Sequence, residues 1–397
     1  MNVTVDNNLK KLYQILLLVL AISLPMPEPI LPIILIALTP LSIYLRINQK
    51  ISIFSHKDTI WYFVLFVLVV VGLFWCIETK QGFKLVEKNL SYLILPIVII
   101  PQLIKDSIQL YKGFVISLLI VAGFTLIATL TTTAFFESES RWYFEEIERF
   151  GFHPTYMAVY SLLAIVFLSY FNIFKNKFLT YLTIAFFVLF LFFLASRIAI
   201  IILVCLLIFK LIVTFEKRYL VGLTIVFLTG ASLFFISEDF NYKTKQLLDF
   251  KGVTYYDNNN YGSVSVRVAK IKASLIVWEK NKWLGTGTGC LKPELVKAYR
   301  SKELECWPCS RKEYNPHNQY LHFLAEYGIV GVVLFLGLLI FLIINALKTK
   351  DYTFLEVLII FLFVFLTESL LFRQKGITAF TFFMILIYRL KNRKISA

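Results

Sequence analysis

The sequence predicts an all-α polytopic membrane protein with about twelve transmembrane helices and one large, mainly helical loop outside the cytoplasm. Hydrophobic residues make up 58% of the 397 residues and charged residues only 16%, with a mean hydropathy of +0.75. A soluble domain of this length would carry more charge on its surface, so we expect the surplus apolar side chains to face lipid. Long apolar runs also recur along the chain, and basic residues gather in alternate connections between them.

The apolar runs are long enough to cross a bilayer, and in lipid they are predicted to be helices because backbone polar groups must be satisfied internally. They lie at residues 12–25, 29–46, 58–77, 89–104, 112–135, 154–174, 178–195, 198–214, 219–236, 328–347, 354–371 and 376–390. The fourth run is short and contains Pro96 and Pro101. The first run ends at Pro25 rather than at a small-residue cleavage site, which predicts a retained span.

The connections between runs predict the orientation. If the N-terminus is cytoplasmic, every inside connection is basic, and the outside segment 137–149 is rich in Glu, which is the positive-inside pattern. The weakest point is the connection with Lys80, Lys84 and Lys88. We therefore predict cytoplasmic N- and C-termini, nine helices in residues 1–236, an extracytoplasmic loop in 237–327 and three helices in 328–397. The formal charge of +15 is then topological and indicates no nucleic-acid partner.

The long loop is predicted to have structure and function of its own, because it far exceeds the usual connection length. Its middle is predicted to be an amphipathic helix. The expected apolar stripe is Val264, Val268, Ile271, Leu275 and Trp278, and the expected polar side contains Arg267, Lys270, Lys272 and Lys280. The glycines of residues 285–289 are interpreted as a turn rather than a phosphate loop, since no Lys-Ser/Thr follows them.

The five cysteines divide into Cys76 and Cys205 in predicted spans and Cys290, Cys306 and Cys309 in the loop. The CxxC spacing of the last two matches a redox motif, but no thioredoxin-like pattern surrounds it. Three thiols in an oxidising compartment cannot all pair internally, so we predict one structural disulfide with its pairing open. A fourth zinc ligand is missing, and the outer loops contain no Asp-x-Asp pair that would indicate a metal-dependent reaction.

His317, one of four histidines, precedes the run at 328–347 on the outer side. A neutral imidazole there can accept a proton from a sugar hydroxyl or orient it by a hydrogen bond. The alternative is a structural helix start, because Asn315 and Asn318 are good cap residues and Pro316 is a good first residue.

Five more residues are candidates at the same side of the membrane. Arg197 sits in a tight outer hairpin, where it either extends to the headgroups or binds a phosphate. Arg267 is either a solvated residue of the loop helix or a second phosphate contact. His153 is a cap or a ligand at the start of a span, and Glu368 and Arg373 flank the last outer hairpin, where they pair or frame a cavity.

Three segments together resemble the O-antigen ligases and the Wzy-type O-antigen polymerases, which are membrane glycosyltransferases. They are Ala195-Ser196-Arg197, then Arg267 followed by Trp278 and Leu284-Gly285-Thr286-Gly287, and last Pro316-His317-Asn318-Gln319-Tyr320 running into Glu326-Tyr327-Gly328. They occur in the family's order, and the last is the most specific. The first 130 residues match only in hydrophobicity.

The resemblance implies a GT-C-like fold in a bacterial inner membrane, acting at its outer face among membrane lipids. Such enzymes move a glycan from undecaprenyl diphosphate to a hydroxyl of lipid A-core or of another glycan, with inversion and without a metal or other cofactor. Arg197 and Arg267 match the family's paired arginines, which would bind the diphosphate. His317 matches its histidine, which would orient or deprotonate the acceptor. His153, Glu368 and Arg373 are expected to contact substrate. The motifs do not separate ligase from polymerase.

Two other classes of protein agree less well with the sequence. A flippase for lipid-linked oligosaccharides would be expected to carry charged residues inside its spans and symmetry between its halves, whereas these runs contain almost no charge. A peptidoglycan-type glycan polymerase would be favoured by acidic catalytic residues in the outer loops, and the histidine and arginines do not favour it.

Overall fold

The computed structural model describes residues 2–27, 29–77, 79–136, 152–236 and 263–395, and all regular structure within them is helical. The acidic segment 137–149 and the first part of the long loop lie outside these ranges. The helices are α1 (Asn2–Ser23), α2 (Ile30–Asn48), α3 (Asp58–Val71), α4 (Thr79–Val98), α5 (Ser107–Phe136), α7 (Pro154–Tyr170), α8 (Lys177–Phe193), α9 (Arg197–Thr214), α10 (Lys217–Ile236), α12 (Ser263–Lys280), α13 (Leu291–Tyr299), α14 (Trp307–Arg311), α15 (Gln319–Lys348), α16 (Tyr352–Phe365) and α17 (Gln374–Ile395).

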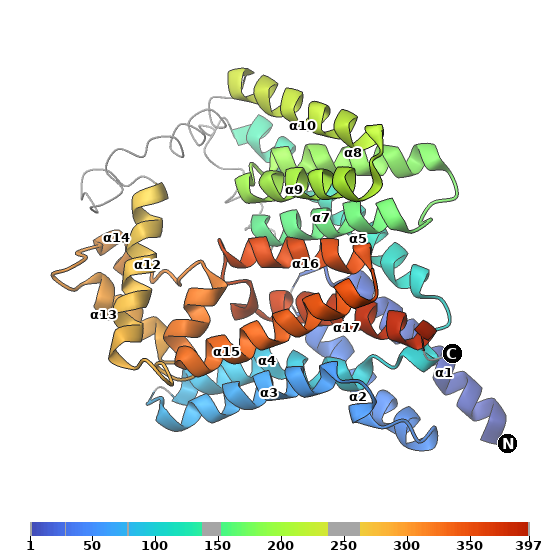
Figure 1. Ribbon diagram of the computed structural model, residues 1–397, viewed down its shortest axis with the longest axis horizontal. Coiled ribbons are helices and arrows are strands. Elements are labelled where there is room, and N and C mark those ends of the chain that lie inside the picture. The colour runs from blue at the N-terminus through green and yellow to red at the C-terminus, as the bar shows by residue number, and fades with distance from the viewer. Residues whose placement is uncertain (1, 28, 78, 137–151, 237–262, 396–397) are drawn as a thin grey trace.

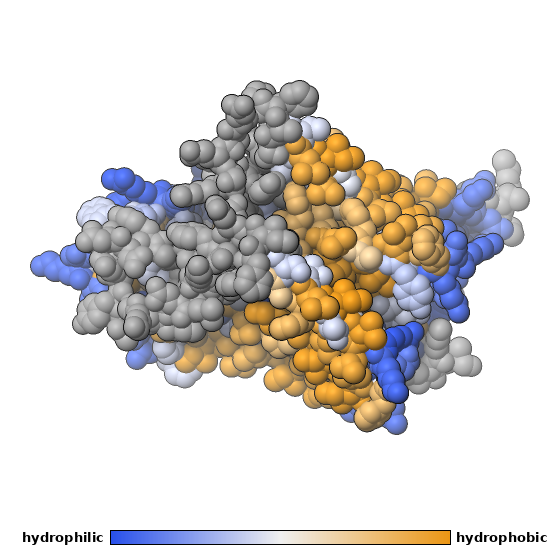
Figure 2. Space-filling model, turned by 90° about the horizontal axis from the view of Figure 1, so that it is seen from above, coloured by the Kyte–Doolittle hydropathy of each residue, from blue (hydrophilic) through white to orange (hydrophobic). Residues whose placement is uncertain are grey.

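Most of these helices run side by side, and α12, α13 and α14 cover one end of the bundle (Figure 1). In the part of the chain described, five segments are long and apolar enough to cross a membrane, at Ile30–Asn48, Asp58–Trp75, Ser107–Thr131, Arg197–Thr214 and Gln319–Lys348. Orange, hydrophobic residues form a belt that blue, hydrophilic residues bound (Figure 2). The protein is therefore a membrane protein whose described residues form helices and no strands. A helix overlaps each of the predicted runs, but a dozen crossings stay a prediction.

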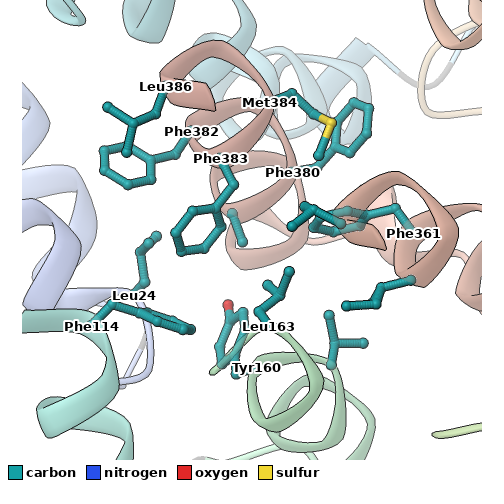
Figure 3. Packing of buried hydrophobic residues seen from close by; sticks show 14 of the residues in the cluster. Leu24, Phe114, Tyr160, Leu163, Phe361, Phe380, Phe382, Phe383, Met384 and Leu386 are labelled. Atoms are coloured by element: carbon teal, nitrogen blue, oxygen red, sulfur yellow. The ribbon is translucent and has the colours of Figure 1, made fainter. Parts of the chain in front are cut away.

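The centre of the bundle is formed by α7 and α17, whose middle residues are buried on all sides. A helix that is apolar all round needs such an enclosed position. Phe380 and Phe383 of α17 point toward opposite neighbours, where their rings meet Phe361 of α16 at 5.1 Å and Phe114 of α5 at 4.9 Å between centroids (Figure 3). These edge-on contacts tie the late helices to the early ones, so the last segment of the chain completes the core.

The outer unit, made of α12, α13, α14 and the start of α15, has a small core of its own. The loop helix was predicted correctly, but its buried face was wrong. α12 buries Ala269, Ala273 and Val277, whereas Ile271 is 43% exposed and Lys270 only 7%. Small alanine side chains allow the helix to approach α13 and α15 closely, so the alanines rather than the larger apolar residues set the contact face.

The glycine-rich segment 285–289 is the predicted turn, and it joins the outer unit to the bundle. Its backbone donates from Thr286 to Ala325 at 3.0 Å, from Gly287 to Glu326 at 2.8 Å and from Thr288 to Gly72 at 3.0 Å. Gly287 has a φ of +83°, and a Cβ there would lie 2.5 Å from the Gly72 oxygen. Only glycine fits this position.

Two disulfides hold this end of the molecule, Cys76–Cys290 and Cys306–Cys309, and Cys205 is free. The expectation of a single disulfide was wrong because Cys76 had been placed inside a span. In the structure α3 ends at Val71 and a short 3₁₀ turn follows, so Cys76 emerges beside the glycine turn. It supplies the fourth thiol that the sequence did not reveal.

Buried charges lie at the opposite end of the bundle, which corrects the view that the spans contain almost no charge. Nε of Arg389 binds Oδ2 of Asp58 at 2.9 Å with both side chains fully buried, and the same guanidinium donates to the carbonyl oxygens of Pro96 and Ile99. Arg46 donates to neighbouring carbonyls of the same segment. The guanidinium groups thus satisfy acceptors that α4 leaves open where it ends.

A second buried pair joins Lys210 of α9 to Glu356 of α16, with 3.2 Å between Nζ and Oε2. The hydroxyl of Tyr170, the last residue of α7, donates to the other carboxylate oxygen at 2.5 Å. Charges inside the spans are the feature expected of a flippase. Here they are paired with one another near helix ends, so they connect helices and do not favour transport.

Candidate active site

His317 and Glu368 form a hydrogen-bonded pair at the end of the bundle that the outer unit covers. Nδ1 of His317 lies 3.1 Å from Oε2 of Glu368, and the two side chains are 30% and 24% exposed. Glu368 follows α16, and His317 precedes α15. The sequence had named both residues but had not paired them with each other.

The backbone around His317 explains both of its predicted roles. Asn318 is the N-cap of α15, because its Oδ1 accepts from the Leu321 amide at 3.0 Å, and its Nδ2 donates to the Leu366 carbonyl. The side chain of Asn315 accepts from the His317 amide at 3.0 Å and holds that residue at a φ of +47°. The asparagines therefore start the helix, and the imidazole remains available to meet Glu368.

Glu368 is held in its ionised form by its surroundings. Burial alone would raise the pKa of Glu368, but the hydrogen bond and charge of His317, together with His153 and Lys270, outweigh it and lower the pKa below the usual value. Since a carboxylate only accepts hydrogen bonds, Nδ1 of His317 is the donor of this pair. The second ring nitrogen, Nε2, is then the acceptor in the neutral imidazole.

His153 and Arg373 lie near the pair. His153 is the N-cap of α7, with its Nδ1 accepting from the Thr155 amide at 3.3 Å, so the cap interpretation holds. Burial lowers the pKa of His153 to about 4, and the positive charges of Arg373, His317 and Lys375 add to this effect while Glu368 opposes it. His153 is therefore neutral near pH 7, while Arg373 is exposed at the start of α17.

Arg197 and Arg267 come from different elements, and their charges interact. Arg197 is the first residue of α9 and is half-buried, and Arg267 lies on the exposed side of α12. Their positive charges are near enough to repel each other. Two guanidinium groups held together in this way form a favourable site for an anion, which relieves the repulsion.

Electrostatic contacts join all the candidates into one cluster. Arg197 interacts with Arg267, Arg267 with Lys270, and Lys270 with Glu368. Glu368 in turn interacts with His317 and His153. His153 also interacts with the charge of Arg373. Sequence reasoning missed three cationic members, which are Lys270, Lys312 and Lys375. Their only signal was proximity in sequence to residues already named. Within the described ranges, no three side chains of His, Cys, Asp or Glu gather as metal ligands would.

Comparison with known proteins bears on this cluster directly. Residues 182–336 match the family model described as O-antigen ligase, and this range contains Arg197, Arg267 and His317. Over this range the chain is similar to the O-antigen ligase family. No curated protein matches the chain. The O-antigen ligase family implies a glycosyltransferase-type activity on a lipid-linked glycan and an acceptor. His153, Glu368 and Arg373 lie outside the matched range, so their place in the cluster rests on the structure alone.

Proposed function

We propose that this protein transfers a glycan from undecaprenyl diphosphate to a hydroxyl of lipid A-core or of another glycan, at the outer face of a bacterial inner membrane. The observation that carries the proposal is the His317–Glu368 pair, 3.1 Å apart, in one charged cluster with Arg197 and Arg267. A basic nitrogen and a pair of cations are what this reaction needs. The nitrogen can accept the proton of the attacking hydroxyl, and the cations can stabilise the negative charge of the departing diphosphate.

The acceptor hydroxyl binds Nε2 of His317, because Nδ1 is occupied by Glu368. Glu368 fixes the tautomer and stabilises the positive charge that develops when His317 takes the proton. The acceptor oxygen then attacks the anomeric carbon from the side opposite the diphosphate, and the configuration inverts. Arg197 and Arg267 neutralise the charge that develops on the diphosphate, so the residues present supply the charge stabilisation without a metal ion.

The disulfides support the proposed compartment. Disulfides form and persist in oxidising surroundings and are rare in the cytosol. Cys76–Cys290 and Cys306–Cys309 both lie at the end of the bundle that carries the charged cluster. This end therefore faces away from the cytoplasm in our proposal, with the N- and C-termini on the cytoplasmic side.

Glycan transfer in reconstituted vesicles tests the proposal. Lipid-diphosphate-linked oligosaccharide is offered with lipid A-core or with a second donor molecule. Transfer to lipid A-core indicates a ligase, and lengthening of the donor glycan indicates a polymerase. Arg197→Ala, Arg267→Ala and His317→Ala are expected to lose activity while folding normally. Movement of the donor between leaflets without transfer would instead support a flippase and refute the proposal.

A further inference from the structure

Lys270 is a buried lysine in the charged cluster, and the family resemblance does not include it. Its side chain is 7% exposed, and its Nζ lies 3.9 Å from the centroid of the Tyr314 ring. That ring meets the imidazole of His317 edge-on, with 6.0 Å between centroids. The Tyr314 ring thus lies between the ammonium and the imidazole of His317, which is proposed to bind the acceptor hydroxyl.

The ammonium also interacts electrostatically with residues of both parts of the proposed site. Lys270 follows Arg267 by three residues, so the two are neighbours on the surface of α12, with Arg267 exposed and Lys270 buried. Its charge interacts with that of Glu368 and with that of Arg267. If the diphosphate binds the arginines and the acceptor hydroxyl binds His317, the bond that breaks lies between them, beside Lys270.

The surroundings of Lys270 leave its hydrogen-bonding capacity unused. An ammonium has three donors, and taking it out of water is costly unless an acceptor replaces the lost hydration. In the described part of the chain, Nζ lies over the face of the Tyr314 ring and takes part in no hydrogen bond or ion pair. Glu368, the carboxylate with which Lys270 interacts electrostatically, is already hydrogen-bonded to His317. An anionic ligand would complete this site.

We propose that Lys270 is a further catalytic residue, which donates a hydrogen bond to the sugar-linked phosphate of the lipid diphosphate. This inference rests on the proposed function. As the acceptor oxygen bonds to the anomeric carbon, the bond from that carbon to the phosphate oxygen breaks, and its electron pair stays on the phosphate. The acceptor proton passes to His317. The new negative charge on the leaving phosphate then faces Lys270, so the contact strengthens as the bond breaks.

Steady-state transfer kinetics in vesicles test this role, with Lys270→Met, Lys270→Arg and a matched control, Lys280→Met. Lys280 lies on the same helix, 55% exposed, and pairs with Glu294 across 3.9 Å. Removing a hydrogen-bond donor from a developing oxyanion typically costs about 100-fold to 1,000-fold in kcat. We expect a kcat loss of about 100-fold or more in Lys270→Met, with the KM for donor changed less than about threefold, and no loss in the control.

The pH dependence distinguishes a catalytic from a structural role. Burial lowers the pKa of Lys270 to about 8, with Glu368 opposing and Arg267 and Lys312 adding to the effect. The ratio kcat/KM reports groups of the free enzyme, so in the wild type it should decline above about pH 8 as Lys270 loses its proton. Lys270→Arg keeps a positive charge over this range and should not show the decline. This comparison also decides the question if Lys270→Met does not fold.

Four outcomes separate the hypotheses. If the wild type transfers no glycan, the proposed function fails and this inference fails with it. If the wild type transfers glycan and folded Lys270→Met keeps its kcat within threefold, only the role of Lys270 is refuted. The same holds if Lys270→Arg shows the alkaline decline of the wild type. A selective kcat loss in Lys270→Met together with a flat alkaline profile in Lys270→Arg supports the inference.

Discussion

Substitution of Glu368 by glutamine keeps the size of the side chain but removes the charge that faces His317. The bond it changes is 3.1 Å long, and its partners are 30% and 24% exposed, so water screens it only in part. A hydrogen bond to a charged group contributes about 1.5–3 kcal/mol. At about 1.4 kcal/mol for each factor of ten in rate, Glu368→Gln is expected to slow transfer by roughly tenfold to a hundredfold.

The assay is the single-turnover rate of glycan transfer with saturating donor, which excludes product release from the measurement. Glu313→Gln is the matched control, because Glu313 pairs with Lys292 on the outer unit and is 51% exposed. A surface pair of this kind contributes little, so the control should react at the wild-type rate. The melting temperatures of Glu368→Gln and Glu313→Gln would show whether either variant is misfolded.

A double-mutant cycle with His317→Asn tests the reasoning more severely. If Glu368 acts through His317, its substitution should have almost no effect once the imidazole is gone, so the two losses will not multiply. Multiplying losses would show that Glu368 acts on the substrate by itself. A Glu368→Gln rate within threefold of the wild type would refute the role of the pair altogether.

Three further predictions concern stability in detergent. Gly287→Ala should lower the melting temperature, because strained backbone at a positive φ costs about 1–3 kcal/mol and Gly287 has a φ of +83°. The control Gly123→Ala should not lower it, since no atom lies within 4 Å of the new Cβ. Equal shifts in the two variants would contradict the packing argument. Arg389→Met should destabilise the protein by about 3–5 kcal/mol, because it leaves Asp58 buried without its partner. Adding Asp58→Asn to this variant should restore part of the lost stability. If no stability is recovered, the pairing of Arg389 with Asp58 is contradicted. The folded-state pKa of His153 is about 4 against an ordinary 6.5, so the stability that its neutral form contributes is present above pH 6.5 and lost as pH falls toward 4. His153→Asn keeps the cap without titrating and should weaken that loss, and a melting-temperature profile identical to the wild type would disprove it.

The sequence predicted the positions of the bundle helices well because hydrophobic length is a direct consequence of the bilayer. It predicted the ends of these helices poorly. Residues 58–77 were taken as one run, but the helix proper ends at Val71, and Cys76 emerges to meet Cys290. Hydrophobicity does not distinguish a residue in lipid from one buried under a loop, so the disulfide could not be predicted.

The candidate residues were named from the sequence, but their arrangement was not. His317, Arg197 and Arg267 were named through the family motifs, and Glu368 and His153 through their side of the membrane. The partner of His317 was not predictable, because Glu368 follows it by 51 residues and comes from another helix end. Lys270 was assigned to the solvated side of α12, since counting large apolar residues ignores the alanines that set the buried face.

The cluster has a common structural origin in the antiparallel bundle, which brings alternate connections to one end. His153 caps the start of α7, Arg197 begins α9, and His317 directly precedes the cap of α15. Three helices therefore begin beside the cluster, and the unpaired amides of a helix start carry partial positive charge. Their fields add to those of Arg267 and Lys270 from α12. An anion at this end is thus stabilised by backbone as well as side chains, so loss of Arg197 or of Arg267 alone should weaken the binding of a lipid diphosphate without abolishing it.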